Sequence, residues 1–227
     1  MSLGQHQPVF TSRYKDHAFA ENSAVLEIES GQLADIRPLH WQTETSLGNR
    51  SWACLEHQTF KTQEFVLRQL VDIVSKNGNL LLNVGPRPGG TIPNQVQQPL
   101  RDMGAWFQAN EEAIYGTHPW TVYGEGPTKV VGGAFQENAT QPFTAQDIRL
   151  TAKGNTLYAI ALGWPRDGHL TIHLLGGNSK LKVRDVSLLG SDDRIPWSRG
   201  ADGLELVLRA QASDAYDYSF RITPNEH

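Results

Sequence analysis

Two glutamates and two tryptophans lie within 24 positions of one another early in the chain. Glu29, Trp41, Glu44 and Trp52 all fall near the ends of expected strands, and His40 precedes the first indole. Sugar rings have apolar faces that pack on indole rings, and cleavage of a glycosidic bond needs one carboxyl group as general acid and another as nucleophile or base. These residue types therefore indicate carbohydrate chemistry. The competing interpretation places the tryptophans in a core and makes the glutamates solvated charges.

Composition and charge restrict the class of protein. The chain has 227 residues, 39% hydrophobic and 19% charged, a balance typical of a folded globular protein with one large or two small domains. A net charge of −4 argues against nucleic acid as a partner. The single cysteine, Cys54, excludes an internal disulfide and a multi-cysteine metal site. The sequence shows neither a signal peptide nor an apolar run long enough for a membrane span, so no membrane partner is expected and the compartment is left open.

The first part of the chain has the rhythm of an α/β protein. Three short strands are expected in residues 8–12, 25–30 and 34–45. Apolar residues then recur at i, i+3 and i+4, which predicts a helix over residues 62–76. Thr62 is a suitable N-cap for this helix, and Gly78 can adopt the left-handed conformation that ends it.

A strand and an irregular loop follow this helix. Residues 79–84 are apolar at nearly every position, which predicts a strand covered on both faces of a parallel sheet. The glycine- and proline-rich residues 85–93 come next, and loops at the carboxyl ends of such strands carry ligand sites, so we expect substrate contacts there. A second helix is expected over residues 96–114. Pro99 requires this helix to begin near the proline or to be kinked by it.

The second part of the chain is rich in short alternating segments separated by glycine, asparagine and aspartate turns. This pattern predicts an antiparallel β-sandwich. We predict one domain over residues 5–116 and another over residues 117–227. Residues 124–133 are glycine-rich but lack the Gly-Lys-Ser/Thr ending of a phosphate loop, so we interpret them as a linker and turn.

A metal site is not predicted. His169 and His173 share one face of an expected strand, but no further ligand types cluster near them in the sequence.

Three longer motifs occur in a fixed order. They are EIESGQLADIRPLHWQTETSLGNRSWAC from Glu27, LVDIVSKNGNLLLNVGPRPGGTIP from Leu70 and MGAWFQANEEAIYGTHPW from Met103. Together they resemble the α-L-fucosidase glycoside hydrolase family, over about residues 8–120. The resemblance implies a catalytic (β/α)8 barrel, of which this chain would supply about the last four strands, followed by a β-sandwich. It also implies hydrolysis of terminal α-linked L-fucose with retention, by two carboxyl groups and without a cofactor.

The same resemblance suggests roles for individual residues. Glu29 occupies the position of the family's acid/base carboxylate, although Ser30 replaces the usual arginine after it. Glu27 is a rival, because a residue two positions away lies on the same strand face. Trp52 matches an aromatic residue that packs near the fucose, and Arg13 matches an arginine that contacts the sugar.

Other residues are candidates on their types alone. Trp41 and Glu44 are further candidate substrate contacts. The family's nucleophilic aspartate would lie before residue 1, so catalysis by this chain alone needs another carboxylate in that role. Asp16, Asp35 and Glu44 are the options, and the sequence does not rank them.

The expected partners follow from the implied fold. A fucosylated glycan or glycoside is the expected substrate. Half a barrel leaves two sheet edges and an apolar face uncovered, so we expect copies of the chain to associate and cover them. The alternative hypothesis is a catalytically incomplete fragment that serves as a carbohydrate-binding or structural module, or as one piece of a split enzyme.

Overall fold

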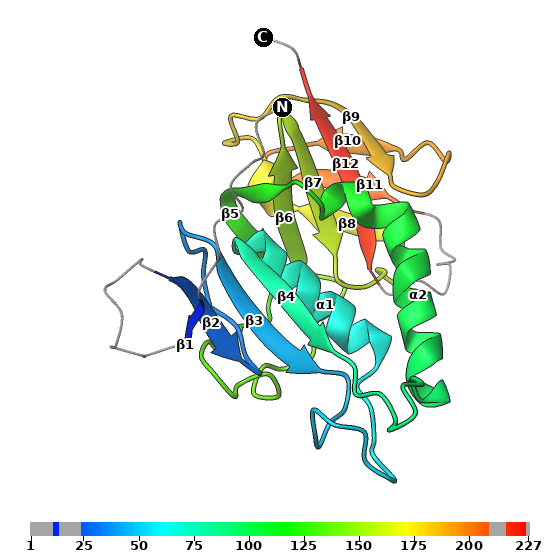
Figure 1. The fold of residues 1–227 in the computed structure, drawn as a ribbon. Helices are drawn as coiled ribbons and strands as arrows, with labels where there is room; N and C mark the ends of the chain where they lie inside the picture. The colour runs from blue at the N-terminus through cyan, green and yellow to red at the C-terminus, as the bar shows by residue number, and fades with distance from the viewer. Residues whose placement is uncertain (1–10, 14–23, 209–216, 226–227) are drawn as a thin grey trace, which may run out of the picture.

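The first part of the chain forms a four-stranded parallel sheet. The computed structural model describes residues 11–13, 24–208 and 217–225. Its parallel sheet has the strand order β1-β2-β3-β4, with neighbours in sequence also neighbours in space (Figure 1). The strands are β1 (Thr11–Arg13), β2 (Val25–Glu29), β3 (Trp41–Ser46) and β4 (Gly78–Asn83).

Helix α1 (Gln63–Ser75) joins β3 to β4 and confirms the first predicted helix. Thr62 is its N-cap, with the side-chain oxygen accepting a hydrogen bond from the Phe65 amide. The predicted end of the helix was wrong by one residue, because Asn77 adopts the left-handed conformation (φ +73°) and Gly78 already begins β4. Gly78 is needed for a different reason, since a Cβ there would lie 2.5 Å from the Trp41 ring.

Strand β4 is followed by helix α2 (Asn94–Asn110). The helix begins five residues before Pro99 and continues past it. The expectation that the helix starts near the proline was therefore wrong. The expectation that β4 is covered on both faces was also wrong. Leu81 is 52% exposed on the face opposite α1, so the apolar run of β4 does not reflect two buried faces.

The second part of the chain is an antiparallel β-sandwich, as predicted. One sheet has the order β5-β6-β7-β12-β9 and the other the order β10-β11-β8. Its elements are β5 (His118–Glu125), β6 (Ile148–Lys153), β7 (Thr156–Ala161), β8 (His169–Ile172), β9 (Val183–Leu188), β10 (Trp197–Arg199), β11 (Leu204–Val207) and β12 (Tyr218–Pro224), with short 3-10 turns at Glu111–Ala113 and His173–Leu175. Strand β5 includes Gly124 and Glu125, the first two residues of the segment that was interpreted as a linker and turn. The rest of that segment, with residues up to 147, forms the loop between β5 and β6.

The five-stranded sheet is covered on both faces. Along β7, Leu157, Ala159 and Ala161 belong to the core between the two sandwich sheets. Tyr158 and Ile160 alternate with them and pack in a second core with residues of α1 and α2. Helix α1 therefore lies between the parallel sheet and the sandwich (Figure 1), and each part buries apolar surface of the other.

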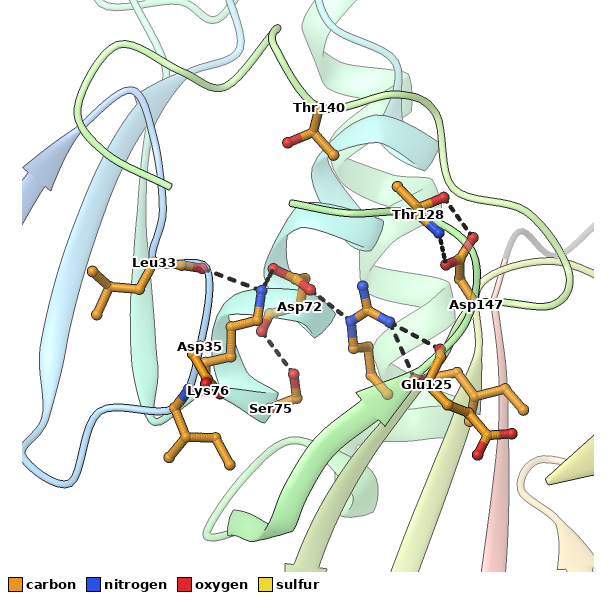
Figure 2. Close-up of polar contacts among 12 residues, drawn as sticks. Leu33, Asp35, Asp72, Ser75, Lys76, Glu125, Thr128, Thr140 and Asp147 are labelled. Carbon is orange, nitrogen blue, oxygen red and sulfur yellow. Dashed lines mark hydrogen bonds and ion pairs between the residues drawn. The ribbon is translucent and has the colours of Figure 1, made fainter. Parts of the chain in front are cut away.

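A buried ion cluster joins α1 to the sandwich. Asp72 and Lys76, one turn apart on α1, and Arg149 on β6 are each at most 1% exposed. The Asp72 carboxylate accepts from Arg149 Nε at 2.6 Å through one oxygen and from Lys76 Nζ at 2.6 Å through the other (Figure 2). Each oxygen thus has a cationic partner, which offsets the cost of burying the three charges.

Other donors of the two cations meet backbone oxygens or aromatic rings, while Arg149 Nη2 is buried without a hydrogen-bond partner among the described residues. Lys76 Nζ donates to the Leu33 carbonyl, in the connection between β2 and β3 (Figure 2). It also lies 4.6 Å from the centre of the Tyr123 ring. Arg149 donates to the Glu125 carbonyl and stacks near Tyr123. Burial lowers the pKa of Lys76, and Asp72 opposes this effect. The cluster thereby connects α1, β5, β6 and the connection after β2.

A second polar contact lies one turn earlier along α1 than Asp72. Arg68 pairs with the fully buried carboxylate of Asp217 at 3.3 Å, and the Trp106 indole of α2 donates to the Asp217 carbonyl at 2.9 Å. Both helices are therefore attached to the start of β12.

The expected partial barrel stays a prediction. Within the described residues, α-helices follow only β3 and β4, and the connection from β2 to β3, residues 30–40, contains none. No helix of the described part is both long and apolar enough to cross a membrane.

The ion cluster yields a stability prediction. Asp72→Ala should lower the free energy of unfolding by about 3–5 kcal/mol, because it leaves two buried cations without a counter-charge. Denaturant titration of both proteins measures the difference. Glu64→Ala is a matched control on the same helix, since it removes the half-exposed i,i+4 partner of Arg68, which keeps its pair with Asp217, and it should cost about 1 kcal/mol or less. Equal losses for the two variants would contradict the account.

Candidate active site

Three glutamates share one face of the parallel sheet. Glu27 and Glu29 are two residues apart on β2, and Glu29 lies directly opposite Glu44 of β3 in the strand register. Side chains alternate along a strand, so all three point to the same face. Ile28 and Trp41 lie on the other face, where they form a core with Ile73 of α1. The polar face of the sheet is thus the one that α1 does not cover.

An arginine and a glutamine complete this acidic cluster. Arg13 of β1 pairs through Nη1 with Glu29 Oε2 at 3.3 Å, and Gln42 Nε2 donates to Glu27 Oε1 at 3.1 Å. The Arg13 side chain is 71% exposed, so water screens its charge. The structure therefore brings together four of the six predicted site residues: Arg13, Glu27, Glu29 and Glu44.

The cluster changes the acidity of one of its members. Burial raises the pKa of Glu44, and the negative charges of Glu27 and Glu29 raise it further, while Arg13 lowers it. A carboxyl group with a raised pKa retains its proton to higher pH than usual. The polar face therefore combines a carboxyl group that holds a proton more readily with a second one that is ion-paired to Arg13.

The strand register sets the backbone spacing of two of the carboxylates. Neighbouring strands lie about 4.8 Å apart, and Glu29 and Glu44 leave opposed positions on the same face. The two side chains therefore start close enough for both carboxyl groups to reach one ligand.

Trp41 does not belong to this site. Its side chain is fully buried on the opposite face, and its Nε1 donates to the Lys76 carbonyl at 2.9 Å. The expectation that Trp41 contacts substrate is therefore wrong, because an indole without exposed surface offers no face to a sugar ring.

Trp52 lies beyond the carboxyl ends of β3 and β4 and is 38% exposed. Its carbonyl accepts from Asn83 Nδ2 at 2.7 Å, and the same amide donates to Ser46 Oγ. Asn83 and Ser46, the last residues of their strands, were missed by the sequence analysis. Their position at the strand ends was the available signal. Gly85 permits this contact, since a Cβ there would lie 2.8 Å from the backbone of the Trp52 loop.

The structure distinguishes the three candidates for a second catalytic carboxylate by their positions. Glu44 is adjacent to Glu29. Asp35 is exposed and interacts with Lys76 and Tyr123, beside the start of β4 (Figure 2). Asp16 lies outside the described residues. Among the described residues, no group of three histidine, cysteine, aspartate or glutamate side chains is placed to hold a metal ion.

The proximity of these carboxylates can be measured directly. Glu29→Gln should lower the pKa of Glu44, because it removes a neighbouring negative charge, and Arg13→Gln should raise it, because it removes a positive one. Carboxyl-carbon NMR titration of Glu44 reports both shifts. Shifts of the same sign in the two variants, or none, would contradict the described cluster.

Comparisons with known proteins identify the family. The α-L-fucosidase family model matches residues 2–112, and the α-L-fucosidase C-terminal domain model matches residues 141–223. The chain is 29% identical to rat tissue α-L-fucosidase over 206 residues, covering 89% of this chain and 40% of the relative. It is 33% identical to human plasma α-L-fucosidase over 169 residues, covering 71% of this chain and 32% of the relative.

A solved structure shows the same relation. α-L-Fucosidase isoenzyme 1 from Paenibacillus thiaminolyticus superposes with a TM-score of 0.70 at 27% identity, covering 89% of this chain and 45% of that one. The chain thus spans 32% to 45% of the length of these relatives. The two family models, the relatives and the shared fold agree, and the chain belongs to the α-L-fucosidase family.

Proposed function

We propose that this chain acts in the hydrolysis of terminal α-linked L-fucose from fucosylated glycans or glycosides, by a two-carboxylate retaining mechanism. The observation that supports it is the pairing of Glu29 with Glu44 on the open polar face, with Arg13 beside them. Family membership supports the substrate class.

In this proposal Glu29 is the acid/base residue, as the family resemblance implies. The raised pKa of Glu44 and the ion pair of Glu29 with Arg13 favour the reverse assignment of the two roles, and the azide experiment below distinguishes the two assignments. Glu29 donates a proton to the glycosidic oxygen while the bond from that oxygen to the anomeric carbon breaks and a second carboxylate forms a bond to the same carbon. Glu29 then accepts a proton from the water that displaces the carboxylate. Glu27 is the rival for this role, since it shares the face and is held by Gln42.

The second carboxylate is Glu44 if the chain catalyses alone. It is the one described candidate that lies beside Glu29. Arg13 and Trp52 would contact the sugar, through charge and through an indole face. The mechanism needs no metal or other cofactor.

We also propose that the parallel sheet is the last part of a (β/α)8 barrel, and that residues 5–116 and 117–227 are its barrel and sandwich domains. Consecutive parallel strands and the β3-α1-β4 unit support the barrel. Among the described strands, β4 pairs only with β3, and Leu81 is exposed on it. Copies of the chain would cover this edge by associating.

A second candidate function is supported by the unpaired edge of β4 and by the greater length of the relatives. The chain spans 40% or less of the two curated relatives given above. It would then be a catalytically incomplete carbohydrate-binding or structural module, or one piece of a split enzyme completed by another polypeptide.

Hydrolysis of an aryl α-L-fucoside tests the leading proposal. The unmodified chain should release the aryl alcohol, and Glu29→Gln should be slower by about a hundredfold or more for poor leaving groups. Added azide separates the roles by stereochemistry. A variant lacking the acid/base should give fucosyl azide with retained configuration, since two displacements occur, and a variant lacking the nucleophile should give the inverted azide, since only one occurs.

Glu27→Gln is the matched control, because it changes a carboxylate on the same face and should retain most of the activity. If Glu27→Gln is the slower variant, the rival assignment is correct. Inactivity of the unmodified chain that is relieved by adding the remaining portion of a family enzyme would establish the split form. Inactivity under both conditions would contradict the catalytic proposal.

Association is tested separately by size-exclusion chromatography with light scattering. The expected mass is a multiple of 25.2 kDa. Leu81→Lys, which puts a charge on the exposed face of β4, should shift the population toward the monomer. A monomer of the unmodified chain at micromolar concentration would contradict the proposal.

A further inference from the structure

A short segment of the sandwich is bonded to the strand end that carries Glu29. Residues 133–137, here called the strap, belong to the loop between β5 and β6. The Phe135 amide donates to the Glu29 carbonyl at 2.8 Å, and the Glu137 amide donates to the Ser30 carbonyl at 3.0 Å. The Gly133 amide donates to the Gln32 carbonyl at 2.8 Å. The strap thus donates three backbone hydrogen bonds to the end of β2 and the residues directly after it.

The two backbones are in direct contact. A Cβ on Gly31 would lie 1.9 Å from the Gly133 carbonyl oxygen, so the contact between the strap and residues 29–32, here called the seam, requires glycine at this position. Ala134 packs against the core of Ile28, Trp41 and Ile73. The seam therefore closes the face of the parallel sheet that lies opposite the carboxylates, in a region where the β2–β3 connection supplies no helix.

The strap has a conformation that its own residues do not favour. Phe135 has φ +60°, an outlier for a bulky side chain, and that side chain is 68% exposed. Ser30, on the other side of the seam, has φ +48°. Backbone of this kind persists where surrounding contacts over-determine it. Packing of the Phe135 side chain does not supply those contacts.

The largely buried carboxylate of Glu137 supplies the contacts that hold this conformation. Glu137 accepts from Thr45 Oγ1 at 2.5 Å and pairs with Lys61 Nζ at 2.9 Å, and the Glu137 and Lys61 side chains are 12% and 6% exposed. Lys61 also donates to the Ser46 carbonyl. Glu137 therefore ties the strap to β3, the strand that carries Glu44.

We propose that Glu137 is a positioning residue for the candidate catalytic pair. Through Thr45 and Lys61 it fixes the strap on β3, and through the strap backbone it fixes the end of β2, so that Glu29 and Glu44 keep their opposed register. The inference rests on the proposed function for its catalytic meaning and on geometry alone for the positioning.

The test uses two kinds of variant. Glu137→Gln combined with Lys61→Met removes both buried charges and so leaves neither unpaired. Thr45→Val removes the hydrogen bond that Thr45 donates to Glu137 and the one that it accepts from Lys61, and it is a milder second variant in case the double variant does not fold. Glu112→Gln, in a half-exposed ion pair remote from this seam, is the control.

Two measurements on the full chain decide the matter without turnover. In both strap variants, the Phe135 and Glu137 amides should exchange with solvent at least about tenfold faster, while core amides of β7 are unchanged. The pKa of Glu44 should fall toward its ordinary value, because Glu29 is no longer held opposite it. The control should change neither quantity.

Two outcomes would overturn the proposal. Unchanged exchange at the strap would show that Glu137 does not hold it, and faster exchange with an unchanged Glu44 titration would show a purely structural role. Where the unmodified chain hydrolyses an aryl fucoside, kcat should fall in the variants with KM within about twofold. An unmodified chain that stays inactive both alone and with the remaining portion of a family enzyme would contradict the proposed function and leave the two NMR outcomes decisive for positioning.

Discussion

The structure depends on the pairing of Asp72 with Arg149 and Lys76 in a site without solvent. Three charges buried between two sheets are unfavourable unless every one is paired, so the cluster restricts how the sheets can sit against each other. Asp72 must meet a cation from its own helix and one from β6 at the same time. A shift of the sandwich relative to α1 would leave a buried charge without its partner. We infer that the cluster fixes the position of α1, and with it the parallel sheet.

The polar face of the parallel sheet follows from that constraint. One side of β2 and β3 faces α1 and buries Ile28 and Trp41, so the alternate side is left for Glu29 and Glu44. The sandwich contributes again through the strap, which covers the end of β2 where the connection forms no helix. In a closed barrel, neighbouring strands and helices hold a strand end in place. In this chain, the described contacts that hold the end of β2 include several from the sandwich.

Local patterns predicted much of this, and long-range contacts explain the rest. Helix α1 and its Thr62 cap were readable because a 3.6-residue period and a cap are local signals. The sequence did not show which face of β3 is buried. Trp41 shares the buried face with Thr43 and Thr45, and the residues of the open face are polar as well, so apolar and polar residues do not alternate clearly. Leu81 is apolar yet exposed, so the sequence of β4 suggested a covered strand. The strap gave no local signal, since its partners lie about 75 to 107 positions earlier in the chain. Its glycines resembled those of an ordinary linker.

The most direct test of this account is native-state hydrogen exchange, measured strand by strand. If the ion cluster makes the two sheets one cooperative unit, amides of Thr43 and Thr45 in β3 and of Tyr158 and Ile160 in β7 should open with free energies within about 1 kcal/mol of each other. Both sets should lose protection together in Asp72→Ala. Opening of β3 at a free energy several kcal/mol below that of β7 in the unmodified chain would show that the sheet bearing the glutamates moves independently of the sandwich, and would contradict the account.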